Sequence, residues 1–287
     1  MATFELSGKT ALVTGAARGI GFATARALVA RGASVLIADL DAEKAAAAAA
    51  QIHDTRAAGI AADVTDRGAL QRAVATALDR FGSLDVLVAN AGIASRPATL
   101  RAMPPETVER ILDTNLLGVW RSVDAALPEI VARKGHIVLI SSIYAFINGV
   151  GTIPYAMSKA AVEQLGRALR LELVLHGASV SVAYFGFIDT EMVHRAIDQD
   201  ALATEMIGTF PAPLRKRVSP DVAAAAIVAG IERRSPRIFR PRRWAAVSVL
   251  RGIVNPLTDM QLERDARSQG LTRQLDERAG EDQPTTA

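Results

Sequence analysis

Short apolar runs alternate with stretches of helical spacing over most of the chain. Five of the runs are bounded by Gly, Asp, Asn or Ser, and they span residues 9–14, 34–38, 59–64, 84–89 and 135–140. Runs of this length and content predict buried strands, and the three- to four-residue apolar spacing between them predicts amphipathic helices. Strands that alternate with helices favour right-handed βαβ units, so the pattern predicts an α/β domain with a parallel sheet.

The predicted strands are followed at the same end by glycine or by polar residues. Gly15, Asp39, Asp63 and Asn90 each stand at such a position. In a parallel sheet the carboxyl ends of the strands share one edge, and ligands bind in the crevice outside that edge. We therefore expect these four residues to meet in one binding site.

A glycine turn joins the first predicted strand to the first predicted helix. The sequence there runs from Gly15 through Arg18, Gly19 and Ile20 to Gly21. Glycines allow a tight turn and let backbone N–H groups approach a pyrophosphate at the helix N-terminus. The spacing differs from the commoner Gly-x-Gly-x-x-Gly fingerprint. Taken alone, a tight loop that binds no ligand explains the glycines nearly as well.

Asp39 ends the second predicted strand, about 20 residues beyond the glycine turn, where an acid can bind both ribose hydroxyls of an adenosine. The alternative is a turn residue, or a cap for the helix that begins near Asp41. A carboxylate at this position would repel the 2′-phosphate of NADP, whereas the guanidinium of Arg18 suits a phosphate. The sequence therefore predicts NAD as the cofactor, with NADP less favoured.

The second half of the chain carries four candidate catalytic residues. Asn115 lies among apolar residues of a predicted helix, either as a functional amide or as a structural amide with satisfied hydrogen bonds. Ser142 follows the fifth predicted strand. Tyr155 and Lys159 lie one turn apart on the next predicted helix, so their side chains share a face. A nearby cation favours the phenolate of a tyrosine, although an isolated Tyr-x-x-x-Lys is more often a structural aromatic and a solvated lysine.

Taken together, these motifs resemble the classical short-chain dehydrogenase/reductase family. The matching segments are Thr14 to Gly21, Asn90 to Gly92, Asn115, Ser142, and Tyr155-x-x-x-Lys159, in register over roughly residues 5–242. The resemblance implies a single doubly wound Rossmann domain with a seven-stranded parallel sheet. It also implies an NAD(H) or NADP(H) cofactor and a homodimer or homotetramer.

The resemblance implies specific roles for individual residues. Tyr155 would be the general acid/base, Ser142 would hydrogen-bond the substrate oxygen, Lys159 would lower the tyrosine pKa and hold the nicotinamide ribose, and Asn115 would anchor a water. The implied cofactor contacts are Gly15, Arg18, Gly19, Ile20, Gly21, Asp39, Asp63, Val64, Asn90, Ala91, Gly92, Tyr155, Lys159, Gly186, Ile188 and Thr190. The chain departs from the family pattern at Phe185, where the family usually has proline, and at Ala89, where it often has asparagine.

Composition narrows the function classes. The 287 residues include no cysteine, which excludes disulfides and thiolate catalysis, and the four histidines lack metal-ligand spacing, so we expect no metal site. No leader segment and no apolar run of about 18 residues is present, which predicts a soluble cytoplasmic protein. The formal net charge of +3 does not by itself imply nucleic acid as a partner.

The segment 187–217 is largely apolar and corresponds to the substrate lid of the family. It favours an apolar secondary alcohol or ketone over a sugar or an acid, with Arg96 and Arg195 as the arginines that could bind a substrate carboxylate. Residues 1–242 form the predicted catalytic domain. Residues 243–287 form a predicted helical extension whose end, Glu281–Ala287, is expected to be disordered.

Six arginines lie near the start of this extension, beside an apolar helix that contains Trp244. We expect the extension to pack over the substrate cleft or across a subunit interface. Peripheral contact with an anionic membrane is the less favoured alternative. No nucleic-acid binding is expected, because no aromatic stacking platform accompanies the arginines.

Two functions fit these observations. The first is an NAD(P)-dependent oxidoreductase that interconverts a secondary alcohol and a ketone. The second is a non-catalytic dinucleotide sensor on the same fold, because fold alone does not determine function. The complete set of Asn115, Ser142, Tyr155 and Lys159 favours the enzyme.

Overall fold

A seven-stranded sheet forms the centre of the molecule. The computed structural model describes residues 3–278 and 285–286. In spatial order the strands are β3 (Ala57–Ala61), β2 (Ser34–Asp39), β1 (Thr10–Thr14), β4 (Val86–Ala89), β6 (His136–Ser142), β7 (Ser179–Phe185) and β8 (Arg237–Arg240). All neighbouring pairs in this sheet are parallel. The predicted doubly wound Rossmann architecture is therefore confirmed, with its topological switch point between β1 and β4.

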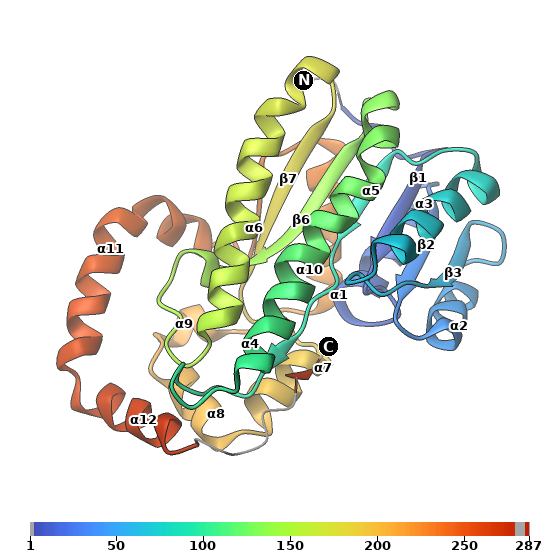
Figure 1. Cartoon of the computed structure of the whole chain (residues 1–287). Coiled ribbons are helices and arrows are strands. Elements are labelled where there is room, and N and C mark those ends of the chain that lie inside the picture. Colours follow the sequence, from blue (N-terminus) through green and yellow to red (C-terminus); the bar gives the residue numbers. More distant parts are fainter. Residues whose placement is uncertain (1–2, 279–284, 287) are drawn as a thin grey trace.

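Helices cover both faces of the sheet (Figure 1). One face packs against α1 (Gly19–Val29), α2 (Ala42–Ile52) and α10 (Pro220–Glu232), and the other against α3 (Arg67–Phe81), α5 (Gly118–Ala132) and α6 (Ile153–Glu172). Along β1, Ala11 and Val13 join the first cluster while Leu12 joins the second. Because both faces are buried, the strands are apolar at nearly every position.

The alanine-rich stretch forms α2 and packs closely on the sheet. A Cβ atom on Gly59 of β3 would lie 2.3 Å from the backbone carbon of Ala45, so only small residues fit at this contact. Asp41 caps the helix by accepting hydrogen bonds from the N–H groups of Glu43 at 3.0 Å and Lys44 at 3.1 Å. The cap is worth about 1 kcal/mol in typical helices.

The chain after β4 and β7 forms the remaining elements around the carboxyl edge of the sheet. β4 is followed by β5 (Ala94–Ser95), α4 (Pro105–Leu112) and a π-helical turn at Asp113–Leu117, which continues into α5. A 3-10 turn at Ile143–Ala145 follows β6. The predicted lid contains α7 (Glu191–Val193), a π-helical turn at His194–Asp198, α8 (Ala201–Gly208) and α9 (Ala212–Arg215).

Two helices follow β8. α11 (Trp244–Arg264) arcs away from the sheet, and α12 (Ala266–Asp276) returns to the lid beside α8 (Figure 1). Within the described ranges, no helix combines the length and apolarity that a membrane span requires. Of the end expected to be disordered, Thr285–Thr286 instead forms β9, which pairs antiparallel with β5 and so satisfies its backbone groups. The remaining residues of that prediction, 281–284 and 287, lie outside the described residues.

His136 is the one histidine in the described part of the chain that is fully buried. Its Nδ1 lies 2.7 Å from the Ser179 hydroxyl and its Nε2 lies 2.8 Å from the Ser181 hydroxyl, both on β7. Burial, followed by the charges of Arg234 and Arg170, lowers the pKa of His136 from 6.5 to about 3. The ring is therefore neutral at pH 7.

This lowered pKa predicts acid sensitivity. Below pH 6.5 the unfolded chain takes up a proton at His136 that the folded protein does not bind until about pH 3. Its contribution to stability is thus complete above the unfolded pKa and is lost with a slope approaching about 1.4 kcal/mol per pH unit as the pH falls through that window. Urea unfolding of the unmodified protein and of His136→Gln should give a shallower slope for the variant. Equal slopes would contradict the prediction.

Candidate active site

A cleft of about 990 Å³ opens at the carboxyl edge of the sheet, over the switch point between β1 and β4. That volume is at the upper end of typical small-molecule sites, so it has room for a dinucleotide. Every predicted cofactor residue except Gly21 lines it, namely Gly15, Arg18, Gly19, Ile20, Asp39, Asp63, Val64, Asn90, Ala91, Gly92, Tyr155, Lys159, Gly186, Ile188 and Thr190.

The glycine turn is shaped by contacts that exclude side chains. Gly15 and Gly19 have φ angles of 61° and 59°, in the left-handed region that favours glycine. A Cβ atom on Gly15 would lie 2.7 Å from the Ala91 Cα. Because α1 begins at Gly19, the N–H groups of its first turn face the cleft, where they favour an anion.

Gly21 does not line the cleft, and its contact with a cofactor stays a prediction. A Cβ atom at Gly21 would lie 2.4 Å from the Gly15 carbonyl oxygen and 2.7 Å from Asn90 Nδ2. Gly21 therefore packs beneath the turn and lets the helix approach it. The spacing of the glycines predicted a tight turn, but it did not indicate that Gly21 packs beneath that turn.

Asp39 holds the glycine turn from the neighbouring strand. Its Oδ2 accepts a hydrogen bond from the Ala17 N–H at 2.8 Å, and its Oδ1 accepts one from the Leu40 N–H at 2.9 Å. The alternative role as the cap of α2 belongs to Asp41 instead. One carboxylate thus both anchors the turn and lines the cleft.

Arg18 spans the mouth of the cleft from the glycine turn to the lid. Its guanidinium forms a partly exposed ion pair with Glu191 at the start of α7. Thr190 caps that short helix by accepting a hydrogen bond from the Val193 N–H at 3.4 Å. Arg18, which from the sequence could bind a nucleotide phosphate, is thus paired with a carboxylate of the lid.

Asn90 ties the ends of β1 and β4 together. Its Nδ2 donates to the carbonyl oxygens of Thr14 and Gly15, both at 2.9 Å. The Thr14 hydroxyl accepts from the N–H groups of Asn90 and Ala91, both at 3.1 Å. On the neighbouring side, Asp63 accepts from the Thr65 N–H and hydroxyl, both at 2.8 Å.

Tyr155 and Lys159 lie on one face of the first turns of α6, as predicted. The Lys159 Nζ is 5.5 Å from the centroid of the Tyr155 ring and donates a 3.0 Å hydrogen bond to the Ile140 carbonyl oxygen. The Ser141 hydroxyl donates to the Lys159 carbonyl oxygen at 2.8 Å and so fixes α6 against β6. The phenol and the ammonium therefore share the inner end of the cleft.

Ser142 is buried at the end of β6, beside the tyrosine. Its hydroxyl donates to the Phe185 carbonyl oxygen and accepts from the Tyr144 N–H, both at 3.3 Å, and it also hydrogen-bonds the Tyr155 phenol. Phe185, the departure from the family pattern, lines the cleft and packs in the core between the sheet and α10.

The pKa values of Tyr155 and Lys159 are set mainly by burial. Burial raises the pKa of Tyr155, and the hydrogen bond with Ser142 offsets only part of that rise. Burial also lowers the pKa of Lys159 to about 8. The expected net lowering of the tyrosine pKa by Lys159 is therefore not what this structure gives, because dry surroundings favour the neutral form of both groups.

Asn115 is fully buried in the π-helical turn between α4 and α5. Its Oδ1 accepts from the Ile93 N–H at 2.8 Å, and its Nδ2 donates to the Ile93 carbonyl oxygen at 2.9 Å. A Cβ atom on Gly92 would lie 3.2 Å from this Oδ1 and 3.6 Å from the Lys159 Nζ. The amide thus holds the loop after β4 in place beside Lys159.

Several residues of the site gave no sequence signal. The main chain of Ile93 and Ile140 provides partners for Asn115 and Lys159, and a carbonyl oxygen carries no side-chain pattern. Trp244 packs on Gly186, where a Cβ atom would lie 2.6 Å from the indole Nε1. The sequence singled out Gly186, but Trp244, the side chain that requires a glycine there, lies 58 residues further along the chain.

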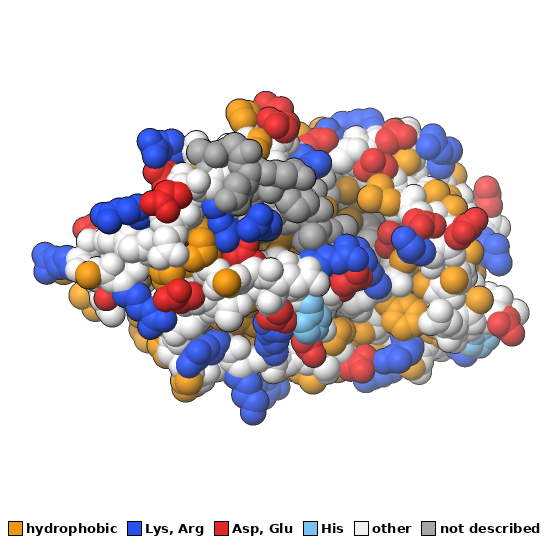
Figure 2. All heavy atoms as spheres, turned by 90° about the horizontal axis from the view of Figure 1, so that it is seen from below, with side chains coloured by type: hydrophobic (Ala, Val, Ile, Leu, Met, Phe, Trp, Pro, Cys, Tyr) orange, Lys and Arg blue, Asp and Glu red, His pale blue; other side chains and the backbone are white. Residues whose placement is uncertain are grey.

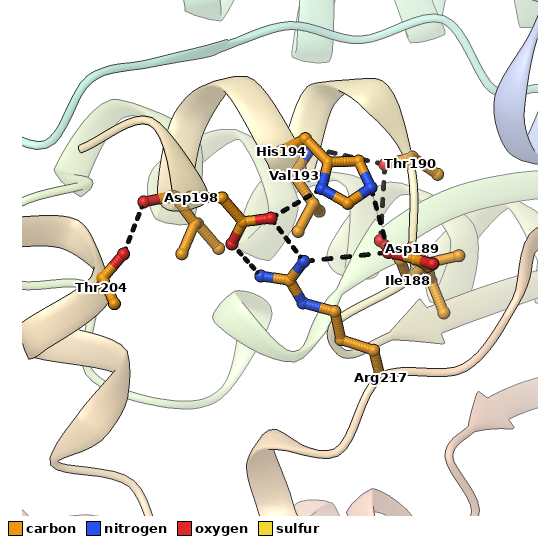
Figure 3. Close-up of polar contacts among 9 residues, drawn as sticks. Ile188, Asp189, Thr190, Val193, His194, Asp198, Thr204 and Arg217 are labelled. Carbon is orange, nitrogen blue, oxygen red and sulfur yellow. Dashed lines mark hydrogen bonds and ion pairs between the residues drawn. The ribbon is translucent and has the colours of Figure 1, made fainter. Parts of the chain in front are cut away.

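The lid is anchored by an exposed cluster of charges. Figure 3 shows His194 between Asp189 and Asp198, at 3.1 Å and 2.6 Å, with the Arg217 guanidinium reaching the same two carboxylates. Hydrogen bonds from Arg217, then from His194, lower the pKa of Asp198 to about 2. The cluster ties the π-helical turn of the lid to the segment before α10.

Apolar side chains lie beyond Tyr144, the ring next to Tyr155. The Tyr144 ring meets the Tyr155 ring edge-on at 6.0 Å, and burial raises the pKa of Tyr144. Beyond it lies an apolar cluster that includes Ile143, Phe146, Phe187, Ile197, Ile207 and Phe210. The two arginines considered for a substrate carboxylate are paired within the protein, Arg96 with Asp200 and Arg195 with Glu191.

The face that carries the cleft shows side chains of both charges. Figure 2 shows basic and acidic side chains interspersed over it, with apolar side chains between them. No large field of one sign covers the part of this face that the structure describes.

Comparisons with known proteins agree with this geometry. The sequence model of the family described as short chain dehydrogenase matches residues 9–201. The chain is 35% identical to the oxidoreductase UcpA of Salmonella typhimurium over 225 residues, which cover 75% of this chain and 84% of that protein. It is 37% identical to the L-fucose dehydrogenase of Mus musculus over 233 residues, covering 79% and 83%. The crystal structure titled gox2181 superposes with a TM-score of 0.74 at 29% identity and covers 82% of this chain and 96% of that one.

Proposed function

Because the chain belongs to the short-chain dehydrogenase family, we propose that it is an NAD-dependent oxidoreductase that interconverts an apolar secondary alcohol and its ketone. The observation that supports this most strongly is that Tyr155 and Lys159 together line a cleft of dinucleotide size, with the Ser142 hydroxyl hydrogen-bonded to the Tyr155 phenol. Reduction of NAD by the purified protein with secondary alcohols, followed by absorbance, tests it. Tight NAD binding without any turnover would favour the dinucleotide sensor.

The residues that line the cleft fit a nicotinamide dinucleotide. The turn from Gly15 to Gly19 and the N-terminus of α1 would hold the pyrophosphate, and Asp39 the adenosine ribose. Lys159 would hold the nicotinamide ribose. The remaining predicted contacts would be Asp63 and Val64 at the adenine, Asn90 to Gly92 along the wall, and Gly186, Ile188 and Thr190 at the nicotinamide amide. When bound, the cofactor supplies the centre that accepts or donates the hydride.

The protein's own contribution is the movement and placement of a proton. Its raised pKa keeps the Tyr155 phenol protonated at neutral pH, which suits donation to the oxygen of a ketone. In the reverse direction the phenolate must form, and the Lys159 ammonium favours it. Because the pKa of Lys159 is about 8, this cation is mostly present at neutral pH. The Ser142 hydroxyl orients the phenol and would hydrogen-bond the substrate oxygen.

The surroundings of Tyr155 favour an apolar substrate. The side chains beyond Tyr144 are aliphatic or aromatic, and Arg96 and Arg195 already pair with carboxylates of the protein. A sugar would leave its hydroxyls without partners against such a surface, which is costly. One relative is named for a sugar, L-fucose. A substrate panel should therefore contain both sugars and apolar alcohols, and we expect turnover of the latter. As in the family, we expect a homodimer or homotetramer.

Asp39 should determine the nucleotide preference. In Asp39→Asn the amide oxygen still accepts from the Ala17 N–H, but the negative charge facing the cleft is lost. We expect the unmodified protein to prefer NAD, and kcat/KM with NADP to rise about tenfold in the variant, equivalent to about 1.4 kcal/mol. Steady-state kinetics with both nucleotides measure this.

Asp41→Asn provides the matched control for that experiment. Asp41 lies two residues further along, caps α2, and does not line the cleft, so its replacement should leave the nucleotide preference unchanged. A preference of the unmodified protein for NADP would show that the assignment of Asp39 is wrong.

A further inference from the structure

The C-terminal strap, residues 244–278, follows the predicted catalytic domain and contacts α6, the loops after β4, β6 and β7, and the lid. It comprises α11, α12 and the two residues after them. Figure 1 shows it leaving the end of β8, arching past α6 and reaching α8 of the lid.

The first half of the strap is fixed to the catalytic domain. At its start Trp244 is buried against Gly186. Arg251 makes two hydrogen bonds, at 2.9 and 3.0 Å, to the carboxylate of Glu163 on α6. Asn255 donates to the carbonyl oxygen of Phe146, in the loop after Ser142, at 2.9 Å. α11 thus runs from the predicted nicotinamide loop to the loop that carries the apolar substrate side.

The far end of the strap is locked by a buried ion pair. Arg278 Nη2 donates to Asp200 Oδ1 at 2.8 Å, and its Nη1 donates to the Pro97 carbonyl oxygen at 2.7 Å. The side chains of Arg278 and Asp200 are only 8% and 2% exposed. Asp200 is also the cap of α8, through a 3.0 Å hydrogen bond from the Ala203 N–H. Removing Arg278 would leave the buried carboxylate with Arg96, at 2.9 Å, as its remaining ion-pair partner, and would free the Pro97 carbonyl oxygen.

The charge of Asp200 is maintained by these partners. Burial alone would raise the pKa of Asp200, but hydrogen bonds from Arg278, from the Ala203 N–H and from Arg96 bring it to about 2. The carboxylate is therefore ionised at neutral pH. Asp200, the cap of the lid helix α8, is thus paired with Arg278 of the strap.

An apolar contact places this lock close to the catalytic tyrosine. Leu275 of α12 is fully buried, and its Cδ1 and the Cε of Met206 on α8 would lie 2.9 and 3.0 Å from a Cβ atom on Gly151. Gly151 stands four residues before Tyr155, and its carbonyl oxygen accepts from the Ala98 N–H at 3.0 Å. The strap, the lid and the loops after β4 and Ser142 therefore interlock at Gly151, in the turn that leads into the helix of Tyr155.

We propose that the strap is a specificity element that holds α8 closed over the substrate side of Tyr155 and so limits the size of the alcohol or ketone that is accepted. Arg278 is its positioning residue, acting through Asp200. This inference rests on the proposed function for its substrate, but the locked lid itself can be measured without turnover. With the lock released, α8 moves away from Gly151 and bulkier apolar substrates enter.

Hydrogen–deuterium exchange of the full-length protein tests the lock. Arg278→Leu should accelerate exchange in peptides covering residues 201–208 by about tenfold or more, the effect of a loss of about 1.4 kcal/mol in local stability. Arg267→Leu is the matched control, because Arg267 also joins the strap to α8, through Glu205, but both side chains are largely exposed at 60% and 46%. Such pairs contribute little. Equal exchange in the two variants would overturn the proposal.

A second variant keeps the test valid if Arg278→Leu folds poorly. The double variant Asp200→Asn, Arg278→Leu removes the buried carboxylate together with its strap partner, while the asparagine can still cap α8, and the same acceleration is expected. Arg278→Lys keeps the positive charge but lacks the planar guanidinium that donates to both Asp200 and Pro97. This variant should therefore show part of the protection of α8 from exchange. Full protection of α8 in the double variant would also overturn the proposal.

Selectivity is measured as the ratio of kcat/KM for a bulky and a compact apolar alcohol. In Arg278→Leu this ratio should rise about tenfold, mainly through KM, while the affinity for NAD stays unchanged. Turnover with an unchanged ratio would refute the strap as a specificity element. Absence of turnover in the unmodified protein, with α8 still protected from exchange, would instead refute the proposed function.

Discussion

Tyr155→Phe should reduce turnover by about a hundredfold to ten-thousandfold, because general acid/base catalysis by a positioned side chain contributes typically 10²–10⁴-fold and no other phenol occupies its place. The ring remains, so its edge-on contact with Tyr144 and the shape of the cleft persist. Dinucleotide affinity should therefore stay within a small factor of that of the unmodified protein. The measurement pairs steady-state kinetics with a titration of NAD.

Tyr184→Phe is the control for this change. The Tyr184 hydroxyl is buried and has no hydrogen-bond partner among the residues that the structure describes, and its ring stacks on Phe239 at 4.7 Å. Loss of that hydroxyl should leave turnover unchanged. If Tyr155→Phe kept more than about a tenth of the activity, the proton would have to come from another group.

Lys159→Met should lower kcat/KM at neutral pH by about a hundredfold or more, within the range expected for a group that tunes an acid/base residue. Methionine has a similar length but lacks the charge 5.5 Å from the Tyr155 ring and the hydrogen bond to the Ile140 carbonyl oxygen. Without the cation the phenolate is harder to form, so alcohol oxidation should recover partly as the pH rises. A pH–rate profile of the variant measures this shift.

Two further variants separate charge from position. Lys159→Arg keeps the cation but changes its shape, so its activity should lie between those of the unmodified protein and Lys159→Met. Lys44→Met removes an exposed lysine that pairs with Asp41 at 3.0 Å, and it should have no effect. A profile of Lys159→Met with the same pH dependence as the unmodified protein would argue against a role of the ammonium in tuning the tyrosine.

The sequence predicted the sheet and the location of the cleft because both depend on local patterns. Apolar runs buried on both faces give the strands, and Gly15, Asp39, Asp63 and Asn90 follow them at one edge, which the parallel order brings together. These four residues could be placed at the cleft because each lies at the end of its strand or within two residues after it.

The rest depends on contacts that no local pattern reports. The sequence predicts a cofactor contact at Gly21, whereas the close contacts that require glycine there are with Gly15 and Asn90, beneath the turn. The pKa of Tyr155 depends on how dry its surroundings are, which only the packed lid and loops determine. The partner of Arg278 is Asp200, 78 residues earlier, and neither lies in a motif that predicts the other.

The central claim is that this cleft transfers a hydride from a secondary alcohol while Tyr155 takes the proton. The most direct measurement uses an apolar secondary alcohol labelled with deuterium at the carbinol carbon, together with NAD and the purified protein. We expect deuterium on the reduced nicotinamide, one for each ketone formed, and formation of this product at least about a hundredfold more slowly with Tyr155→Phe. Saturated NAD binding with no deuterium transferred from any alcohol of the panel would contradict it and would identify the protein as a dinucleotide-binding sensor.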